Sequence, residues 1–132
     1  MSKHPLIAVV DDDASMCGAL QRLLRLEGFR TAAFASAEDF LHAGQRQDTA
    51  CLIVDVRMSG MSGLELQRQL STTNCPIPLI FITAHGDEAA RAQALRAGAV
   101  DFLYKPFREE VLLRAIRSAL QSSRQGGEGA QC

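Results

Sequence analysis

Acidic, hydroxyl and ammonium side chains stand at the ends of short apolar segments in this sequence. They are Asp11, Asp12 and Asp13 after residues 6–10, Asp55 after residues 50–54, Thr83 at the end of residues 79–83, and Lys105 after residues 100–104. Carboxylates brought close together repel and raise one another's pKa, and a divalent cation relieves that repulsion. Oxygen ligands of this kind suit Mg²⁺, which also takes phosphate oxygens. With a lysine and a hydroxyl added, the set predicts a site that holds a phosphoryl group.

The same segments predict the elements that position these side chains. Five short β-rich runs occur at residues 6–10, 30–34, 50–54, 79–83 and 100–104, and a stretch with helical spacing follows each. This repeat predicts an α/β fold with a parallel sheet and helices on both faces. In such open sheets the ligand site lies beyond the carboxyl ends of the strands. We expect a flavodoxin-like doubly wound (βα)5 fold with strand order 2-1-3-4-5, in which the second strand, lacking a reactive end, lies at the edge.

The helical stretches differ in how strongly they are anchored. Ser36 is a good N-cap for the second helix, with Asp39 at the third helical position. The fourth helix, over residues 87–97, is rich in alanine and has few large apolar side chains. The fifth is strongly amphipathic, and the glycine-containing residues 122–132 carry no apolar anchor. We therefore expect one domain over residues 1–121 and a disordered tail or linker over 122–132.

Composition excludes several classes of function for this chain. The 14 basic and 15 acidic residues give a formal charge of −1, so there is no basic excess to bind nucleic acid. No apolar run reaches the roughly 18–20 residues of a membrane span. The start has no signal-peptide pattern, and the four cysteines form no CxxC pair. These features predict a cytoplasmic protein with reduced thiols.

The chemical residues and their neighbours together resemble the receiver domain of bacterial two-component response regulators. The motifs are Val9-Val10-Asp11-Asp12-Asp13, Asp55-Val56-Arg57-Met58 with Gly63 beyond it, Ile82-Thr83-Ala84, and Lys105-Pro106-Phe107. The resemblance covers residues 6–121. The segments Thr83-Ala84-His85-Gly86-Asp87 and Ala97-Gly98-Ala99-Val100-Asp101-Phe102 resemble the FixJ-type branch. One departure is Ser59, which stands where the family usually has proline, and it concerns the stiffness of the loop after Asp55.

The resemblance implies a role for each site residue. Asp55 is the expected phosphoacceptor, and Thr83 and Lys105 are expected to contact the phosphoryl group. The expected Mg²⁺ ligands are Asp12 directly, Asp11 mainly through water, Asp55, and the backbone carbonyl of Arg57. Phe102 is expected to be a switch aromatic that turns inward when Thr83 moves. A cis Lys105-Pro106 bond is expected, and Arg57 and His85 are expected at the rim of the pocket, where they would affect phosphate lifetime.

The resemblance also implies partners. A sensor histidine kinase would donate the phosphoryl group. The face made by the fourth helix and fifth strand would change on phosphorylation and mediate a homodimer or an effector contact. FixJ-type relatives usually carry a C-terminal helix-turn-helix DNA-binding domain, so the resemblance implies a transcriptional output. These residues show no such domain. The domain itself would be a phosphoacceptor that catalyses its own phosphotransfer and dephosphorylation, not an enzyme acting on other substrates.

Other interpretations of these residues remain open at this level. The three aspartates from Asp11 to Asp13 suit a helix N-terminus. Thr83 also suits the end of a strand, Lys105 the protein surface, and Phe102 the apolar core. Asp11-x-Asp13 resembles the motif of haloacid-dehalogenase-type phosphatases, with Asp11 as nucleophile and Asp13 as acid–base, although the chain lacks a cap insertion and an acidic pair after the fourth strand. A third interpretation is a degenerate receiver that acts only as a docking surface.

Overall fold

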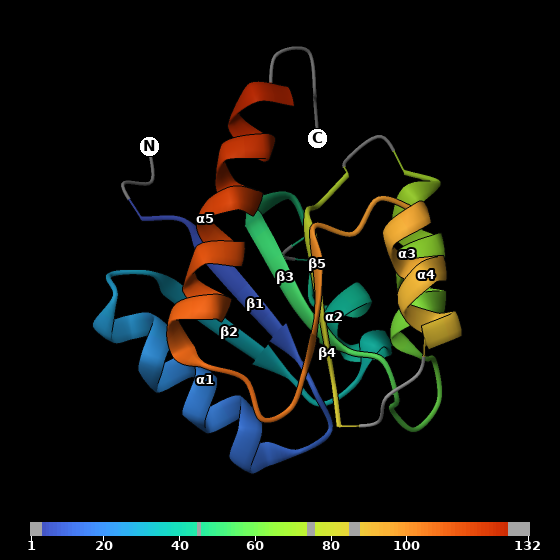
Figure 1. Cartoon of the computed structure of the whole chain (residues 1–132), viewed down its shortest axis with the longest axis horizontal. Helices are drawn as coiled ribbons and strands as arrows, with labels where there is room; N and C mark the ends of the chain where they lie inside the picture. Colours follow the sequence, from blue (N-terminus) through green and yellow to red (C-terminus); the bar gives the residue numbers. More distant parts are fainter. Residues whose placement is uncertain (1–3, 45, 74–75, 85–87, 127–132) are drawn as a thin grey trace.

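The computed structural model describes residues 4–44, 46–73, 76–84 and 88–126. Strands and helices alternate along the chain, as the repeated pattern predicts (Figure 1). The strands are β1 (Leu6–Val10), β2 (Arg30–Phe34), β3 (Thr49–Asp55), β4 (Leu79–Thr83) and β5 (Asp101–Tyr104). The helices are α1 (Ala14–Leu26), α2 (Ala37–His42), α3 (Gly63–Ser71), α4 (Glu88–Arg96) and α5 (Glu109–Gly126), with a short 3-10 helix at Arg46–Asp48.

The five strands form one parallel sheet in the order β2-β1-β3-β4-β5. This confirms the flavodoxin-like fold and its predicted strand order. All five residues of β1 are buried, whereas none of β2 is, because β2 lies at an edge of the sheet. The continuous apolar run of β1 is thus typical of a strand covered on both faces.

The two faces of the sheet carry separate layers of helices. Figure 1 shows α1 and α5 on one face and α3 and α4 on the other, where α2 also packs. On the first face, Leu24 of α1 and Ile116 of α5 pack against side chains such as Ile53 of β3. On the second, Phe40 of α2 and Leu66 of α3 belong to a cluster with the alternate strand residues. This division follows from the two-residue period of a strand.

Side-chain caps begin three of the helices. The Asp13 carboxylate accepts hydrogen bonds from the backbone N–H groups of Ser15 and Met16 at the start of α1. Ser36 Oγ accepts from the backbone of Asp39 at 3.0 Å, which confirms the predicted cap of α2. At α3 the residues Ser62 and Glu65 cap each other's backbone, a reciprocal capping box. These caps fix the directions in which α1 and α3 leave the strand ends.

The last helix extends further than the sequence pattern predicts. Helix α5 runs to Gly126, so residues 122–126 of the expected tail are helical, and residues 127–132 lie outside the described part of the chain. The strand bounds agree with the expected ones for β1, β2 and β4, while β3 is one residue longer at each end and β5 begins at Asp101. In the described part of the chain, no helix has both the length and the apolar content to cross a membrane.

Candidate functional site

The register of the sheet brings the predicted site residues to one edge. Val10 of β1 pairs with Val54 of β3, so Asp11 and Asp55 follow at the same level. Thr83 at the end of β4 pairs with Tyr104 of β5, directly before Lys105. The backbone N–H of Lys105 donates to the Thr83 carbonyl at 2.7 Å, which fixes the two ends together.

Three carboxylates and one ammonium group form the centre of the site. Asp11, Asp12 and Asp55 each present an oxygen, and these oxygens lie within 4.8 Å of one another. Asp11 and Asp55 are buried, with 1% and 8% exposure, while Asp12 is exposed. Lys105 Nζ lies 3.1 Å from Asp11 Oδ2 and 3.3 Å from Asp55 Oδ2. A cluster of carboxylate oxygens that opens to solvent at Asp12 fits the oxygen preference of a hard divalent cation such as Mg²⁺.

The charges of this cluster affect one another. Burial raises the pKa of Asp11 above its ordinary value, and the negative charge of Asp55 acts in the same direction. The backbone N–H of Asp13 and the Lys105 ammonium partly oppose this rise. Desolvation lowers the pKa of Lys105, but its hydrogen bond to Asp11 and the charges of Asp11 and Asp55 outweigh it, so its pKa is raised overall. Lys105 therefore supplies positive charge to carboxylates that are costly to bury alone.

The loop of residues 56–62, which joins β3 to α3 and is called here the β3–α3 loop, approaches the carboxylates through its backbone. Arg57 N–H donates to Asp55 Oδ1 at 3.1 Å, and Ser59 N–H donates to Asp12 Oδ2 at 3.4 Å. A proline at position 59 has no N–H and cannot make the second contact. The loop ends at Gly63, where an added Cβ would lie 2.5 Å from the Asp55 carbonyl oxygen. Glycine at 63 thus lets α3 begin directly against the end of β3.

The structure places Thr83 and Phe102 in the interior. Thr83 is 1% exposed at the carboxyl end of β4. Phe102 is 4% exposed, and its ring centroid lies 6.0 Å from that of Phe81 and 5.5 Å from that of Tyr104. The Phe102 ring is therefore already turned inward in this structure. The predicted switch, in which this ring turns inward, would have to start from a different arrangement of the ring.

The remaining predicted positions separate into three groups. The Lys105-Pro106 bond is cis, which confirms that prediction. Arg57 is exposed, and both its place at the rim of the pocket and its role in phosphate lifetime stay predictions, while His85 lies outside the described residues. Asp13 caps α1 through its carboxylate, as its interpretation as a capping residue predicts, and this holds it away from the acid–base role that the phosphatase alternative requires.

One contact at the site was not predicted from the sequence. Glu38 of α2 accepts a hydrogen bond from the backbone N–H of Met61 in the β3–α3 loop at 3.0 Å. The two residues are far apart in the chain, and no periodic pattern links them. This contact depends on the tertiary fold, which places the start of α2 beside the β3–α3 loop.

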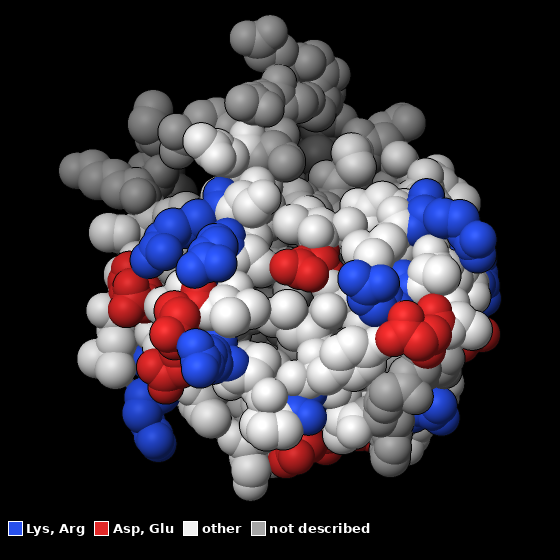
Figure 2. Space-filling view, viewed as in Figure 1, with Lys and Arg blue, Asp and Glu red and all other residues white. Residues whose placement is uncertain are grey.

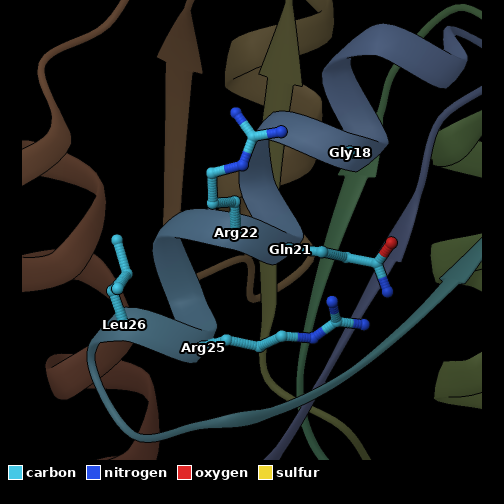
Figure 3. Close-up of a pocket in the computed structure, with 5 residues that line it drawn as sticks. All are labelled: Gly18, Gln21, Arg22, Arg25 and Leu26. Atoms are coloured by element: carbon cyan, nitrogen blue, oxygen red, sulfur yellow. The ribbon is translucent and has the colours of Figure 1, made fainter.

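A separate surface depression of about 340 Å³ lies along α1. It is lined by Gly18, Gln21, Arg22, Arg25 and Leu26 (Figure 3). It shares no residue with the carboxylate cluster and has no acidic group among its lining residues.

Comparison with known proteins agrees with this geometry. Residues 7–117 match the family described as the response regulator receiver domain. The response regulator protein TmoT of Ectopseudomonas mendocina is 48% identical over 97% of this chain and 58% of its own length. The transcriptional regulatory protein FixJ of Bradyrhizobium diazoefficiens is 39% identical over 89% of this chain and 57% of its own length. This chain thus spans between half and three fifths of these curated relatives.

A solved structure supports the same assignment. The crystal structure of FixJ-N superposes with a TM-score of 0.80 at 38% identity, covering 92% of this chain and 96% of the solved one. The match covers most of this chain, whose strand order β2-β1-β3-β4-β5 sets the position of the site. The chain therefore belongs to the response regulator receiver domain family of two-component systems, in its FixJ-type branch.

Proposed function

We propose that this domain accepts a phosphoryl group on Asp55 from a sensor histidine kinase, with Mg²⁺ as cofactor. The observation that carries the proposal is the placement of Asp55. Asp55 is 8% exposed at the end of β3, its carboxylate belongs to a cluster of three, and Lys105 Nζ lies 3.3 Å from Asp55 Oδ2. Asp11, Asp12 and Asp55, with the Arg57 carbonyl, would hold the cation.

The transfer requires an ionised Asp55 and a means of neutralising the incoming charge. A carboxylate oxygen of Asp55 forms a bond to phosphorus, and the bond from phosphorus to the donor's imidazole nitrogen breaks with its electron pair leaving on that nitrogen. The product is an acyl phosphate, and no proton leaves Asp55. Lys105 would pair with the phosphoryl oxygens, and the Thr83 hydroxyl would donate a hydrogen bond to one of them. Bound Mg²⁺ supplies further positive charge to these oxygens.

Exposure and the position of Asp13 favour Asp55 over Asp11 as the phosphoacceptor, because Asp55 is 8% exposed and the hydrogen bonds of the two carboxylates match, each accepting from a backbone N–H and from Lys105. Asp11 is 1% exposed, and its two oxygens accept from the Asp13 backbone N–H at 2.9 Å and from Lys105 at 3.1 Å. Asp13, the acid–base of the phosphatase alternative, caps α1. The lower exposure of Asp11 and the capping role of Asp13 support Asp55 as the acceptor, with Asp11 as a structural and metal-binding carboxylate.

The test uses a small phosphodonor. Incubation with acetyl phosphate and Mg²⁺ should add the mass of one phosphoryl group, and peptide mapping should locate it on Asp55. Asp55→Asn should abolish the addition, because an amide oxygen is a far weaker nucleophile than a carboxylate. Phosphate mapped to Asp11, or stoichiometric phosphate on the Asp55→Asn variant, would contradict the proposal.

The output is proposed to pass through the surface of α4 and β5. Ala90 and Ala94 are the buried residues of α4, so this helix is weakly anchored and easily shifted. A shift there would control a phosphorylation-dependent homodimer, and an effector domain elsewhere in the full protein would turn it into a transcriptional response in the cytoplasm. The relative FixJ, a transcriptional regulatory protein, supports this output. Hydrogen exchange over α4 and β5 should change on phosphorylation, and the mass of the particle in solution should double.

A further inference from the structure

Glu38 connects α2 to the loop that borders the carboxylate cluster. Glu38 Oε2 accepts the backbone N–H of Met61 at 3.0 Å. Met61 lies in the β3–α3 loop, which also carries Arg57 and Ser59, the two residues whose N–H groups reach Asp55 and Asp12. The carboxylate of Glu38 therefore contacts the same loop whose backbone N–H groups bond to Asp55 and Asp12.

Gly60 allows this contact to be close. Its φ of 77° lies in the left-handed region, and an added Cβ would lie 2.8 Å from Glu38 Oε2. A side chain at position 60 would be strained by the backbone and would also displace the carboxylate. The loop is thus shaped to receive Glu38 at this point.

The charge state of Glu38 strengthens the contact. The backbone N–H groups of Glu38 itself and of Met61 hold the pKa of Glu38 below its ordinary value, so its carboxylate is ionised at neutral pH. Hydrogen bonds to an ionised acceptor are stronger than those between neutral groups.

The loop needs such an external contact because of its sequence. Ser59 replaces the proline that would fix the backbone dihedral φ at that position. The hydrogen bond from Ser59 N–H to Asp12 is long, at 3.4 Å, whereas the bond from Met61 to Glu38 is 3.0 Å. Of the two contacts, the one to Glu38 has the geometry of a firm hydrogen bond.

We propose that Glu38 is a positioning residue for the phosphorylation site. By holding Met61 and Gly60, it keeps the β3–α3 loop in the arrangement in which the Arg57 backbone reaches Asp55 and the metal site. The part of this inference that concerns phosphoryl transfer rests on the proposed function, whereas the part that concerns the loop does not.

The experiment compares Glu38→Ala with Asp39→Ala. Both remove an acidic side chain from the first turn of α2, so any effect of that charge on the helix is matched, but Asp39 is exposed and the hydrogen bond to Met61 N–H is made by Glu38. Glu38→Ala should speed hydrogen exchange of the Met61 amide while the Gly63 amide, which bonds to the Val56 carbonyl, keeps its protection. Calorimetric titration should show Mg²⁺ affinity weakened roughly 3- to 10-fold, at or below the low end of losses seen when supporting residues of metal sites are removed. Asp39→Ala should change neither.

Two more variants separate positioning from charge. Glu38→Gln keeps an oxygen acceptor for Met61 N–H and should recover most of the Mg²⁺ affinity. Gly60→Ala should displace Glu38 and reproduce the loosened Met61 amide with Glu38 still present.

Unchanged Met61 exchange in Glu38→Ala would overturn the contact, and loosened exchange with parental Mg²⁺ affinity would overturn the positioning role. A parent protein that binds Mg²⁺ but takes up no phosphate would overturn the proposed function instead, and Met61 exchange and Mg²⁺ affinity would still decide the role of Glu38.

Discussion

Lys105 links two buried carboxylates that would otherwise repel each other. Its ammonium lies 3.1 Å from Asp11 and 3.3 Å from Asp55, and its side chain is 15% exposed. The same two carboxylates belong to the cluster of Asp11, Asp12 and Asp55 that could hold a divalent cation. Lys105 and the cation therefore act on one shared set of negative charges, and the loss of one makes the site depend more on the other.

Lys105→Ala should make the folded state depend on Mg²⁺. Without metal, the variant should lose about 1–3 kcal/mol of unfolding free energy, because Asp11 loses a charged hydrogen-bond partner in a buried position. Added Mg²⁺ stabilises the folded state by an amount that grows with the logarithm of its concentration divided by Kd, and its affinity should rise when the competing ammonium is absent. Thermal unfolding with and without Mg²⁺ measures both effects. An equal Mg²⁺-induced rise in Tm for parent and variant would contradict this competition.

Cys51 illustrates a residue whose environment suppresses its chemistry. It is fully buried in β3, and burial raises the pKa of its thiol to about 12. Because the thiolate is the reactive form, Cys51 should resist iodoacetamide in the native protein at mildly alkaline pH and react once the chain is unfolded. Peptide mapping after labelling measures this directly, and equal labelling of native and unfolded protein would refute it.

The same raised pKa gives a signed dependence of stability on pH. An unfolded cysteine titrates near a pKa of about 8.5. Between that value and about 12 the folded state holds a proton that the unfolded state releases. The contribution of Cys51 to stability is therefore complete below about pH 8.5 and declines as the pH rises above it.

At the scale of elements, the buried side chains of α4 are small. Its buried residues are Ala90 and Ala94, and the buried Gln67 of α3 donates a hydrogen bond from Nε2 to the Ala94 carbonyl at 3.1 Å. That carbonyl also accepts from Ala99 N–H at 3.0 Å, so it keeps a partner if Gln67 is replaced. Gln67 thus ties α3 to α4 without being essential to either helix.

Gln67→Met should lower the local stability of α4 while changing the global unfolding free energy little. Methionine fills a similar volume, so the change in global unfolding free energy should stay within about 1.5 kcal/mol, the usual net value of one hydrogen bond. Amides of α4 should lose protection in hydrogen exchange, while those of α5 should keep theirs. A uniform change across both helices would indicate that Gln67 acts on global stability alone.

Local sequence was sufficient to predict the elements but not their contacts. The carboxyl ends of β1, β3 and β4 were predictable because apolar runs stop at Asp11, Asp55 and Thr83 and a parallel sheet brings such ends together. The contact from Glu38 to Met61 was not, because it depends on how α2 packs beside the β3–α3 loop. The inward position of Phe102 is set in the same way, by packing against Phe81.

At the scale of the whole molecule, one sheet separates two apolar clusters. Neighbouring residues of β3 contribute to opposite clusters, Ile53 to that beneath α1 and α5 and Leu52 to that beneath α2, α3 and α4. Neither helix layer can lose its packing without exposing one face of the shared strands. On the face shown in Figure 2, positive and negative groups are interspersed, in keeping with a formal charge of −1.

This shared sheet predicts a single cooperative unfolding transition. Leu24→Ala in α1 and Leu66→Ala in α3 each remove a fully buried side chain, from opposite faces of the sheet. Each should lower the unfolding free energy by about 2–5 kcal/mol through lost burial and the cavity left behind. Because the clusters share their strands, urea unfolding followed by circular dichroism should remain one transition in both variants.

Leu26→Ala is the matched control on the same helix. Leu26 is 79% exposed beside the α1 depression (Figure 3), so the same substitution removes little buried surface and should change the unfolding free energy by no more than about 0.5 kcal/mol. Two separate transitions in the Leu66→Ala variant would show that the α2–α3–α4 layer unfolds on its own. In that case the proposed shift of α4 on phosphorylation would remain on its own face of the sheet, and the packing of α1 and α5 would not change with it.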